Sequence, residues 1–228
     1  EISLQAAGEF ILRYAELAET MAGAEACGQR RGELMQIADT CRRLSEHSAR
    51  TFAEALQAVW FLFVLLQIES NASSFSLGRF DQYMWPYLSE ELRHGRLALA
   101  EAQIWLEMFL LKVNEIVLLR SSKSARYFAG FPIGFNLIVG GQLPHGGDAT
   151  NSLSYMCLRA QADLGLTQPN LGIRIHRDSP QAFLRAAAHV ISRGSGMPQL
   201  FNDEVIVPGQ IRRGIPREVA LDCAVVGC

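Results

Sequence analysis

The residue best suited to chemistry in this sequence is Cys228, which closes the stretch DCAVVGC at residues 222–228. Gly227 precedes it, and a glycine lets the backbone turn sharply and hold the thiol away from the chain. A lone cysteine after an apolar run is commonly a packing residue. No histidine lies nearby in the sequence to generate a thiolate, so a papain-like nucleophile has little support. The residue types leave both interpretations of Cys228 open, a packed thiol or a reactive one.

A second stretch of interest is IESNASSFSLGRFDQYMWPY, residues 68–87, which is rich in hydroxyl groups and carries Arg79 and Asp81. Buried hydroxyls and charges are costly unless each finds a partner. The stretch is therefore either a polar surface loop or part of a site. His176 ends an alternating segment, and it is either a structural histidine or a residue that faces a site.

The sequence lacks the familiar motifs of several other chemistries. The run Gly194, Ser195, Gly196 follows a predicted helix, which favours a helix end over a phosphate-binding loop. The five cysteines include no Cys-x-x-Cys pair, and the five histidines form no His-Glu-x-x-His motif. No Gly-x-Ser-x-Gly elbow is present. We therefore expect no metal site, no bound cofactor, no disulfide framework and no hydrolase triad.

Composition limits the partners of the chain. Hydrophobic residues make up 49% of its 228 residues and charged residues 19%, so much of it should be interior. A net charge of −2 without a basic block argues against nucleic acid as a partner. The longest apolar run, residues 58–66, is shorter than the roughly 20 residues that a membrane helix needs. With no secretion pattern at the N-terminus, we expect a cytoplasmic location and no membrane segment.

The first half of the chain is predicted to be helical. Helices are expected over residues 9–23 and 30–47, and a third follows the capping-box pattern of Thr51 and Glu54. The third is apolar on nearly all sides and should be buried. A fourth is expected over residues 97–119, and apolar residues recur along one side of it. That side carries Ile104, Met108, Leu111, Glu115 and Leu118.

The second half alternates between strand and helix patterns. Strands are predicted over residues 135–141, 170–176 and 197–204. Helices are predicted over residues 150–164 and 216–223. A further helix is predicted between them: Ser179 caps it, Pro180 is its first residue, and it ends before Gly194. Such alternation is typical of parallel strands with helical crossovers, so the fold class is α/β, as part of a barrel or an open sheet.

Several of these stretches together resemble the glycyl radical enzymes, the pyruvate formate-lyase-like proteins. The resemblance rests on SGMPQLFNDEVI, GIPREVALDCAVVGC, FAGFPIGFNLIVGGQ and the stretches of residues 69–87 and 147–180, and it covers roughly residues 50–228. It implies a ten-stranded α/β barrel with a cysteine on a loop inside it. The chain would be the central fragment of that barrel domain, mainly helical over residues 1–125 and alternating over residues 126–228. An N-terminal portion and a C-terminal glycyl radical domain would be absent from it.

By this resemblance Cys228 matches the cysteine that becomes a thiyl radical. A glycyl radical elsewhere in the full protein would remove its hydrogen atom, and the thiyl would then take hydrogen from a substrate carbon. A radical S-adenosylmethionine activating enzyme would install the glycyl radical, and the protein is expected to be a homodimer. Homolytic cleavage needs no low thiol pKa, but it needs a dry, closed site.

The resemblance also implies substrate-binding residues. The Gly227–Cys228 pair differs from the two adjacent cysteines of pyruvate formate-lyase, and SFSLGRFDQYM is most like the diol dehydratases. Those enzymes hold substrate hydroxyls with a His–Ser pair. Ser73 and Ser74 occupy the matching positions here, where Ser73 departs from the pattern and argues against glycerol in particular.

Two aromatic residues and one polar pair complete the predicted site. Phe128 and Phe135 fall where the family places aromatic pocket residues, with ordinary core packing as the alternative. Asn202 and Asp203 either support the cysteine loop or cap the next helix.

These observations predict an enzyme that eliminates water from a small polyol. The alternatives within the family are a carbon–nitrogen or carbon–carbon lyase, like choline trimethylamine-lyase, formate acetyltransferase or the arylacetate decarboxylases. An alternative of another kind is a non-catalytic barrel that acts as a binding scaffold. The 228 residues alone are expected to be inactive.

Overall fold

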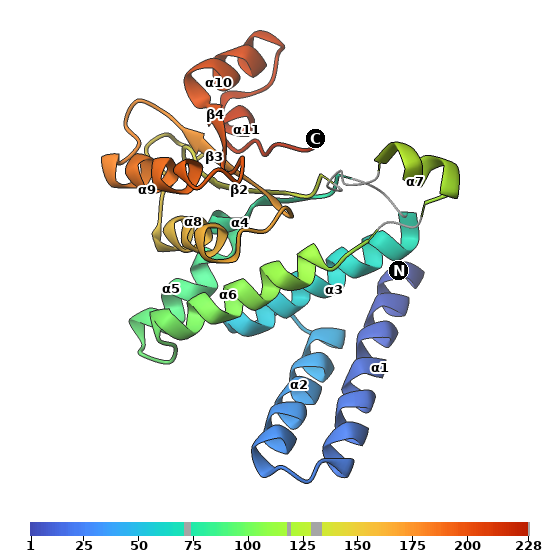
Figure 1. The fold of residues 1–228 in the computed structure, drawn as a ribbon. Coiled ribbons are helices and arrows are strands. Elements are labelled where there is room, and N and C mark those ends of the chain that lie inside the picture. The colour runs from blue at the N-terminus through green and yellow to red at the C-terminus, as the bar shows by residue number, and fades with distance from the viewer. Residues whose placement is uncertain (71–73, 118–119, 129–133, 228) are drawn as a thin grey trace. The chain divides into compact units, whose positions relative to one another are not determined.

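The computed structural model describes residues 1–70, 74–117, 120–127 and 134–227, with the helix assignment of residue 128. Contacts divide the chain into two compact units, residues 1–69 and residues 70–228, which are described separately (Figure 1). The first unit is helical, as predicted for the first half. The second unit contains a parallel sheet with helices, so the α/β prediction is confirmed.

The first unit consists of α1 (Ile2–Ala24), α2 (Gly28–Glu46) and α3 (Phe52–Ser70). Helices α1 and α2 form a hairpin, and a buried cluster joins them to α3. That cluster contains Ile11, Ala15, Cys41 and Phe61, with Phe10 and Leu44 against it. The Thr51 hydroxyl accepts a hydrogen bond from the backbone N–H of Glu54 at 3.1 Å, as the capping pattern predicts.

Helix α3 differs from its prediction in burial. Phe52 and Phe61 are buried, but Leu62 and Ile68 are 59% and 65% exposed, so the expectation of a helix buried on nearly all sides is wrong. By length and composition alone, the 19 residues of α3 could also cross a membrane. This is weak evidence, because an apolar core helix of a soluble protein meets the same criterion.

In its described residues, the second unit contains a sheet of four parallel strands in the order β1-β2-β3-β4. They are β1 (Ser76–Arg79), β2 (Asn136–Gly140), β3 (Asn170–Ile175) and β4 (Gln199–Asn202). Asn136 of β2 lies opposite Asn170 of β3, and Gly140 lies opposite Arg174. Since side chains alternate along a strand, Asn136, Asn170 and Arg174 belong to one face of the sheet, which we call the polar face.

A bulge in β1 changes which of its side chains reach the polar face. Ser76 lies opposite Asn136 and Arg79 lies opposite Ile138, so three steps along β1 match two steps along β2. Gly78, with φ of +67°, lies within this irregularity. The extra residue turns Ser76 and Arg79 toward the same face, although strict alternation would separate them.

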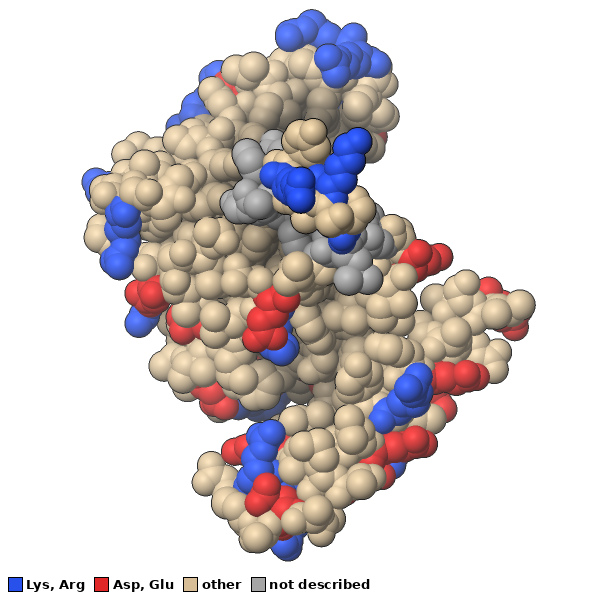
Figure 2. Space-filling view, turned by 45° about the vertical axis from the view of Figure 1, so that its right-hand side comes forward, with Lys and Arg blue, Asp and Glu red and all other residues tan. Residues whose placement is uncertain are grey.

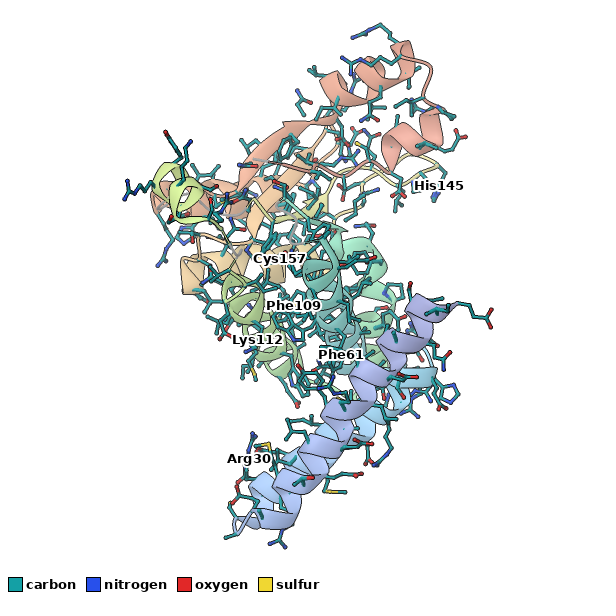
Figure 3. All side chains as sticks on the ribbon, turned by 90° about the vertical axis from the view of Figure 1, so that its right-hand side faces the viewer. Arg30, Phe61, Phe109, Lys112, His145 and Cys157 are labelled. Atoms are coloured by element: carbon teal, nitrogen blue, oxygen red, sulfur yellow. The ribbon has the colours of Figure 1, made fainter. Side chains whose placement is uncertain are left out.

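Helices cover the opposite face of the sheet. Leu137 of β2 and Leu171 of β3 meet α6 (Leu99–Asn114) and α8 (Ser152–Leu164). Phe80, at the start of α4 (Phe80–Tyr83), stacks on Phe109 of α6 with ring centroids 5.5 Å apart. Figure 3 shows Phe109 and Cys157 among the side chains of this helical layer. The remaining helices are α5 (Trp85–Arg93), α7 (Ser122–Phe128), α9 (Gln181–Ser192), α10 (Asp203–Arg212) and α11 (Arg217–Leu221).

Charged side chains are scattered over the face seen in Figure 2, with a group of basic ones where α10 lies. Arg212, Arg213 and Arg217, around the α10–α11 connection, are all exposed. This group of basic side chains is small and exposed. It does not change the expectation, drawn from the net charge of −2, that nucleic acid is not a partner.

Helix α6 and the segment before β1 correct two predictions. The helix expected over residues 97–119 ends at Asn114, and Ile104 and Met108 on its predicted apolar side are 56% and 60% exposed. The stretch 68–87 is not a surface loop, because its described part contains the end of α3, β1, α4 and the start of α5. Its charged residues Arg79 and Asp81 are buried.

The predicted cap of α9 is also wrong. Pro180, not Ser179, precedes the first residue of α9, and no side-chain cap is formed there. The Ser179 hydroxyl instead accepts a hydrogen bond from the backbone N–H of His176 at 2.9 Å. Gly194 follows the end of the helix with φ of +80°, as predicted for a helix end.

Candidate active site

The residues that precede Cys228 cross the polar face of the sheet. After α11 ends at Leu221, residues 222–227, which we call the crossing segment, continue without helix or strand pairing. Figure 1 shows this segment running beside the sheet, from the ends of the strands back toward their beginnings. Side chains of β1, β2 and β3 hold its main chain at both ends.

Arg174 of β3 holds the beginning of the crossing segment. Its Nη1 donates hydrogen bonds to the carbonyl oxygens of Leu221 and Cys223, at 2.9 and 2.7 Å. Its Nε and Nη2 pair with the two oxygens of Asp203, at 2.8 and 2.9 Å. Neither side chain of the pair is exposed. The Asp203 carboxylate therefore neutralises the buried guanidinium. Its two hydrogen bonds also fix the orientation of the guanidinium plane, so that Nη1 points at the crossing segment.

Gly141 provides the space that Arg174 needs. A Cβ atom at Gly141 would lie 3.0 Å from both Cβ and Nε of Arg174, and Gly141 has φ of +82°. Both the close approach and the backbone conformation require a glycine.

Arg79 of β1, two strands away from β3 in the sheet, holds the same point. Its Nη1 donates to the Leu221 carbonyl at 3.2 Å and to Oδ1 of Asp222 at 2.9 Å. Its Nη2 donates to the carbonyl of Gly140 at 3.0 Å. Two guanidinium groups from different strands thus meet at one carbonyl oxygen, that of Leu221.

The amino ends of β1 and β2 hold the other end of the crossing segment. The Ser76 hydroxyl donates to the carbonyl of Val225 at 2.9 Å. The backbone N–H of Gly227 donates to Oδ1 of Asn136 at 2.8 Å. Asn136 is only 1% exposed. The side chains of β1 and β2 therefore fix the main chain up to the residue before Cys228.

Gly227 has the conformation that the sequence predicted for it. Its φ of +118° is a value that residues with a side chain rarely adopt, although a Cβ there would meet no atom within 4 Å. The requirement for glycine is therefore conformational and not one of space.

Asp81 is a second buried charged residue close to Arg79, and both side chains bond to the backbone of Gly140. Its carboxylate accepts hydrogen bonds from the Ser154 hydroxyl, the backbone N–H of Gly140 and the Gln82 amide. Burial raises the pKa of Asp81 to about 6, because it disfavours the charged form. The three hydrogen bonds and the charge of Arg79 act in the opposite direction.

Two of the predicted site residues, Cys228 and Ser73, lie outside the described residues. So does the side chain of Phe128 at the end of α7. Ser74 is half-buried two residues before β1, and it is the one residue other than glycine with positive φ, at +66°, in the described part of the chain. Such strained backbone is frequent at binding sites.

Phe135 is completely buried immediately before β2. Its backbone N–H donates to Oε1 of Gln168, and its carbonyl accepts from the N–H of Asn170. Since Asn136 belongs to the polar face, alternation directs Phe135 to the face that the helices cover. This supports the core-packing alternative for Phe135.

The remaining candidates have structural partners. His176 Nε2 lies 3.1 Å from Oδ1 of Asp148, and its Nδ1 accepts from the N–H of Asp178 at 3.3 Å, so it is a structural histidine. Asn202 caps α10 by accepting from the N–H of Glu204 at 2.9 Å. Asp203 supports the crossing segment through Arg174. Of the two predicted roles for this pair, the helix cap therefore applies to Asn202 and the support of the segment before Cys228 applies to Asp203. Among the described residues, no three His, Cys, Asp or Glu side chains gather as a metal site requires.

Sequence reasoning missed three residues that contact the crossing segment. Ser76, Asn136 and Arg174 were not singled out, although Asn136 and Arg174 are polar residues within mainly apolar strands. The polar residues in NLIVG and NLGIRI were the available signal, because a charge or amide buried in a strand needs a specific partner.

Comparison with known proteins agrees with this geometry. The whole chain, residues 1–228, matches the family model described as pyruvate formate lyase-like. It is 40% identical over 237 residues to the "Probable dehydratase YbiW" of Escherichia coli, covering 100% of this chain and 29% of that protein. It is 39% identical over 218 residues to the isethionate sulfite-lyase of Oleidesulfovibrio alaskensis, with 95% and 26% covered.

A solved structure matches over nearly the whole chain. The glycerol-bound B12-independent glycerol dehydratase of Clostridium butyricum superposes with a TM-score of 0.93 at 40% identity, covering 98% of this chain and 28% of that one. The chain therefore belongs to the pyruvate formate lyase-like family of glycyl radical enzymes. The predicted fold, part of the barrel of these enzymes, is confirmed. The chain spans less than a third of the length of the relatives that it matches.

Proposed function

We propose that this chain is the central part of a glycyl radical dehydratase, in which a thiyl radical on Cys228 starts the elimination of water from a small polyol. The observation that carries this proposal is the hydrogen bond from the N–H of Gly227 to Asn136. It holds the main chain beside the polar face of a parallel sheet, at the residue before the cysteine. A packing cysteine would need no such attachment of its backbone.

The chemistry follows from hydrogen-atom transfer. The thiyl radical takes a hydrogen atom from a substrate carbon, which regenerates the Cys228 thiol and leaves a carbon radical. The hydroxyl group on the neighbouring carbon then leaves as water with the proton of the hydroxyl on the radical carbon, which becomes a carbonyl carbon and leaves the radical on the neighbouring carbon. The product radical takes the hydrogen atom back from the thiol. No thiolate is required, so this chemistry needs no base beside the thiol.

The chain also offers groups for the substrate. Ser74, with its strained backbone, is proposed to bind a substrate hydroxyl together with Ser73. Phe128 is proposed as an apolar wall of the pocket, whereas Phe135, which is completely buried, is assigned to the core. The similarity to a dehydratase and to a glycerol-bound dehydratase structure supports a polyol substrate.

A second candidate reaction is cleavage of a carbon–sulfur bond. The similarity to isethionate sulfite-lyase, at 39% identity, is almost as high as that to the probable dehydratase. Both reactions begin with the same hydrogen abstraction, so the crossing segment serves either. The choice depends on which group leaves the carbon next to the radical.

Family membership also supports three further proposals for the whole protein. The glycyl radical lies outside these residues and is installed by a radical S-adenosylmethionine activating enzyme. The protein functions as a homodimer, without a bound cofactor. It is located in the cytoplasm, where α3 serves as a core helix through the buried cluster around Phe61.

The test uses the full-length protein that contains this chain, activated without oxygen. Electron paramagnetic resonance should show a glycyl doublet, and Cys228→Ala should keep that doublet while product formation is lost. A substrate panel of propane-1,2-diol, glycerol, hydroxyproline, choline and isethionate should give turnover with a diol. Turnover with isethionate alone would select the second candidate, and turnover in Cys228→Ala would reject both.

A further inference from the structure

The crossing segment has an unusual form of attachment. Extended chain beside a sheet is ordinarily held by backbone pairing with a strand. Residues 222–227 form no such pairing in the described structure. The N–H of Asp222 bonds to carbonyl groups of α11 and its side chain to Arg79, whereas Cys223, Val225 and Gly227 are each held by a hydrogen bond from a main-chain atom to a side chain of β1, β2 or β3. The position of this backbone therefore depends on a few individual side chains.

Among those side chains, Asn136 contacts the segment nearest to Cys228. The arginines act at Leu221 and Cys223, five or more residues before it, and Ser76 acts at Val225. Asn136 acts at Gly227. An error in backbone position grows with the number of free dihedral angles that follow the last fixed point, so the last attachment has the largest effect on the next residue.

Asn136 is itself held in place. It is the first residue of β2, it pairs in register with Ser76 and Asn170 on the strands at either side, and it is 1% exposed. Its backbone N–H donates to the carbonyl of Phe75 at 3.1 Å. The 2.8 Å hydrogen bond from Gly227 thus ends on an acceptor whose backbone is fixed by two neighbouring strands.

We propose that Asn136 is a positioning residue for the radical reaction: its Oδ1 fixes the N–H of Gly227, and thereby the backbone from which the Cys228 thiol reaches the substrate. This rests on the role proposed above for Cys228. Hydrogen-atom transfer is steep in distance, and a misplacement of about 1 Å costs about 100-fold in rate. Asn136 contributes this effect without taking part in the bond changes.

The test compares variants of the activated full-length protein. Asn136→Leu removes the acceptor at similar volume, and Asn136→Asp keeps an acceptor oxygen. The matched control is Gln103→Leu, which removes a buried amide whose Nε2 donates to the carbonyl of Met156 at 3.3 Å, in the helical layer and away from the crossing segment. For each variant, glycyl radical per chain, melting temperature, kcat and KM are measured.

Asn136→Leu should match Gln103→Leu in radical content and melting temperature and keep KM within about threefold, while kcat falls about 100-fold. The kcat of Asn136→Asp should be at least about tenfold higher than that of Asn136→Leu. Equal kcat in Asn136→Leu and Gln103→Leu, or a loss expressed in KM alone, would overturn the inference.

Two further variants keep the test decisive. If Asn136→Leu lowers the melting temperature more than the control, Asn136→Ala replaces it, because it removes the same Oδ1 acceptor without adding an apolar side chain of similar size. An Asn136→Ala protein with normal kcat would then overturn the inference. Cys228→Ala is measured in parallel: if it turns over substrate, the proposed function fails, whereas normal kcat in Asn136→Leu with an inactive Cys228→Ala rejects only the role of Asn136.

Discussion

The guanidinium of Arg174 and the carboxylate of Asp203 form a two-point ion pair, at 2.8 and 2.9 Å, in which neither side chain is exposed. The third nitrogen of the guanidinium, Nη1, donates hydrogen bonds to the carbonyl groups of Leu221 and Cys223. The pair therefore connects β3 and the start of α10 to the segment that precedes Cys228.

Removing Asp203 should be strongly destabilising, because it leaves a buried guanidinium without a counter-charge. We expect Asp203→Ala to lower the free energy of unfolding by about 3–5 kcal/mol. Glu204→Gln, which breaks the exposed pair with Arg177 at 2.7 Å, should cost far less stability, because solvent screens that pair. Chemical unfolding of the full-length protein measures both, and equal losses would contradict the role of the buried pair.

Alanine at position 227 should impair turnover through the backbone. The φ of +118° at Gly227 strains any residue with a Cβ, by about 1–2 kcal/mol or more. We expect Gly227→Ala to lower turnover per glycyl radical by at least about tenfold. Gly209→Ala in α10 is the matched control, since its φ is not positive and a Cβ there meets no atom. Unchanged turnover in Gly227→Ala would show that this backbone conformation is dispensable.

Asp81 should give the stability a distinct pH dependence. Burial raises its folded-state pKa to about 6 from 3.8, so the folded state binds the proton more tightly than the unfolded state does. Its contribution is therefore most favourable below pH 4 and declines by about 3 kcal/mol as the pH rises to 6.

The measurement is the difference in unfolding free energy between the natural protein and Asp81→Asn at several pH values. Relative to the variant, the natural protein should lose stability between about pH 4 and pH 6 and then change little. A difference that is constant across this range would show that the pKa of Asp81 is not raised.

The buried cysteines should be chemically inert in the folded protein. Burial, and after it the charge of Asp81, raises the pKa of Cys157, and burial raises the pKa of Cys41. Both should resist alkylation until the protein unfolds, because the thiolate is the reactive form. Mass spectrometry after a short treatment with iodoacetamide measures this, with the exposed Cys27 as the internal comparison. Early labelling of Cys157 would contradict the packing of α8.

The sequence was sufficient for those elements whose patterns are local. The apolar run before Gly140 and the alternation around Ile173 predict β2 and β3, and their helical connections predict parallel pairing, which the structure has. The stretch around Arg79 was ambiguous, because a four-residue strand followed directly by α4 shows no clear period. The exposure of Ile104 was not predictable from periodicity. The spacing of apolar residues shows that a helix has an apolar side, but not whether another element packs against that side.

The candidate site was predictable only in part for a similar reason. Gly227 could be singled out because a glycine before a cysteine has a local conformational meaning. Asn136 could not, because its function depends on a contact with a residue 91 positions later in the chain. The placement of Arg79 beside Ser76 depends on a bulge between two strands, which no sequence pattern in β1 reveals.

The strands hold the crossing segment almost entirely by atoms that every amino acid possesses. The attachments reach the carbonyl groups of Leu221, Cys223 and Val225 and the N–H of Gly227, and Asp222 alone contributes a side chain. The side chains of residues 224–226 are consequently free to diversify and to reshape the neighbouring space for new substrates, while the route of the backbone stays constant.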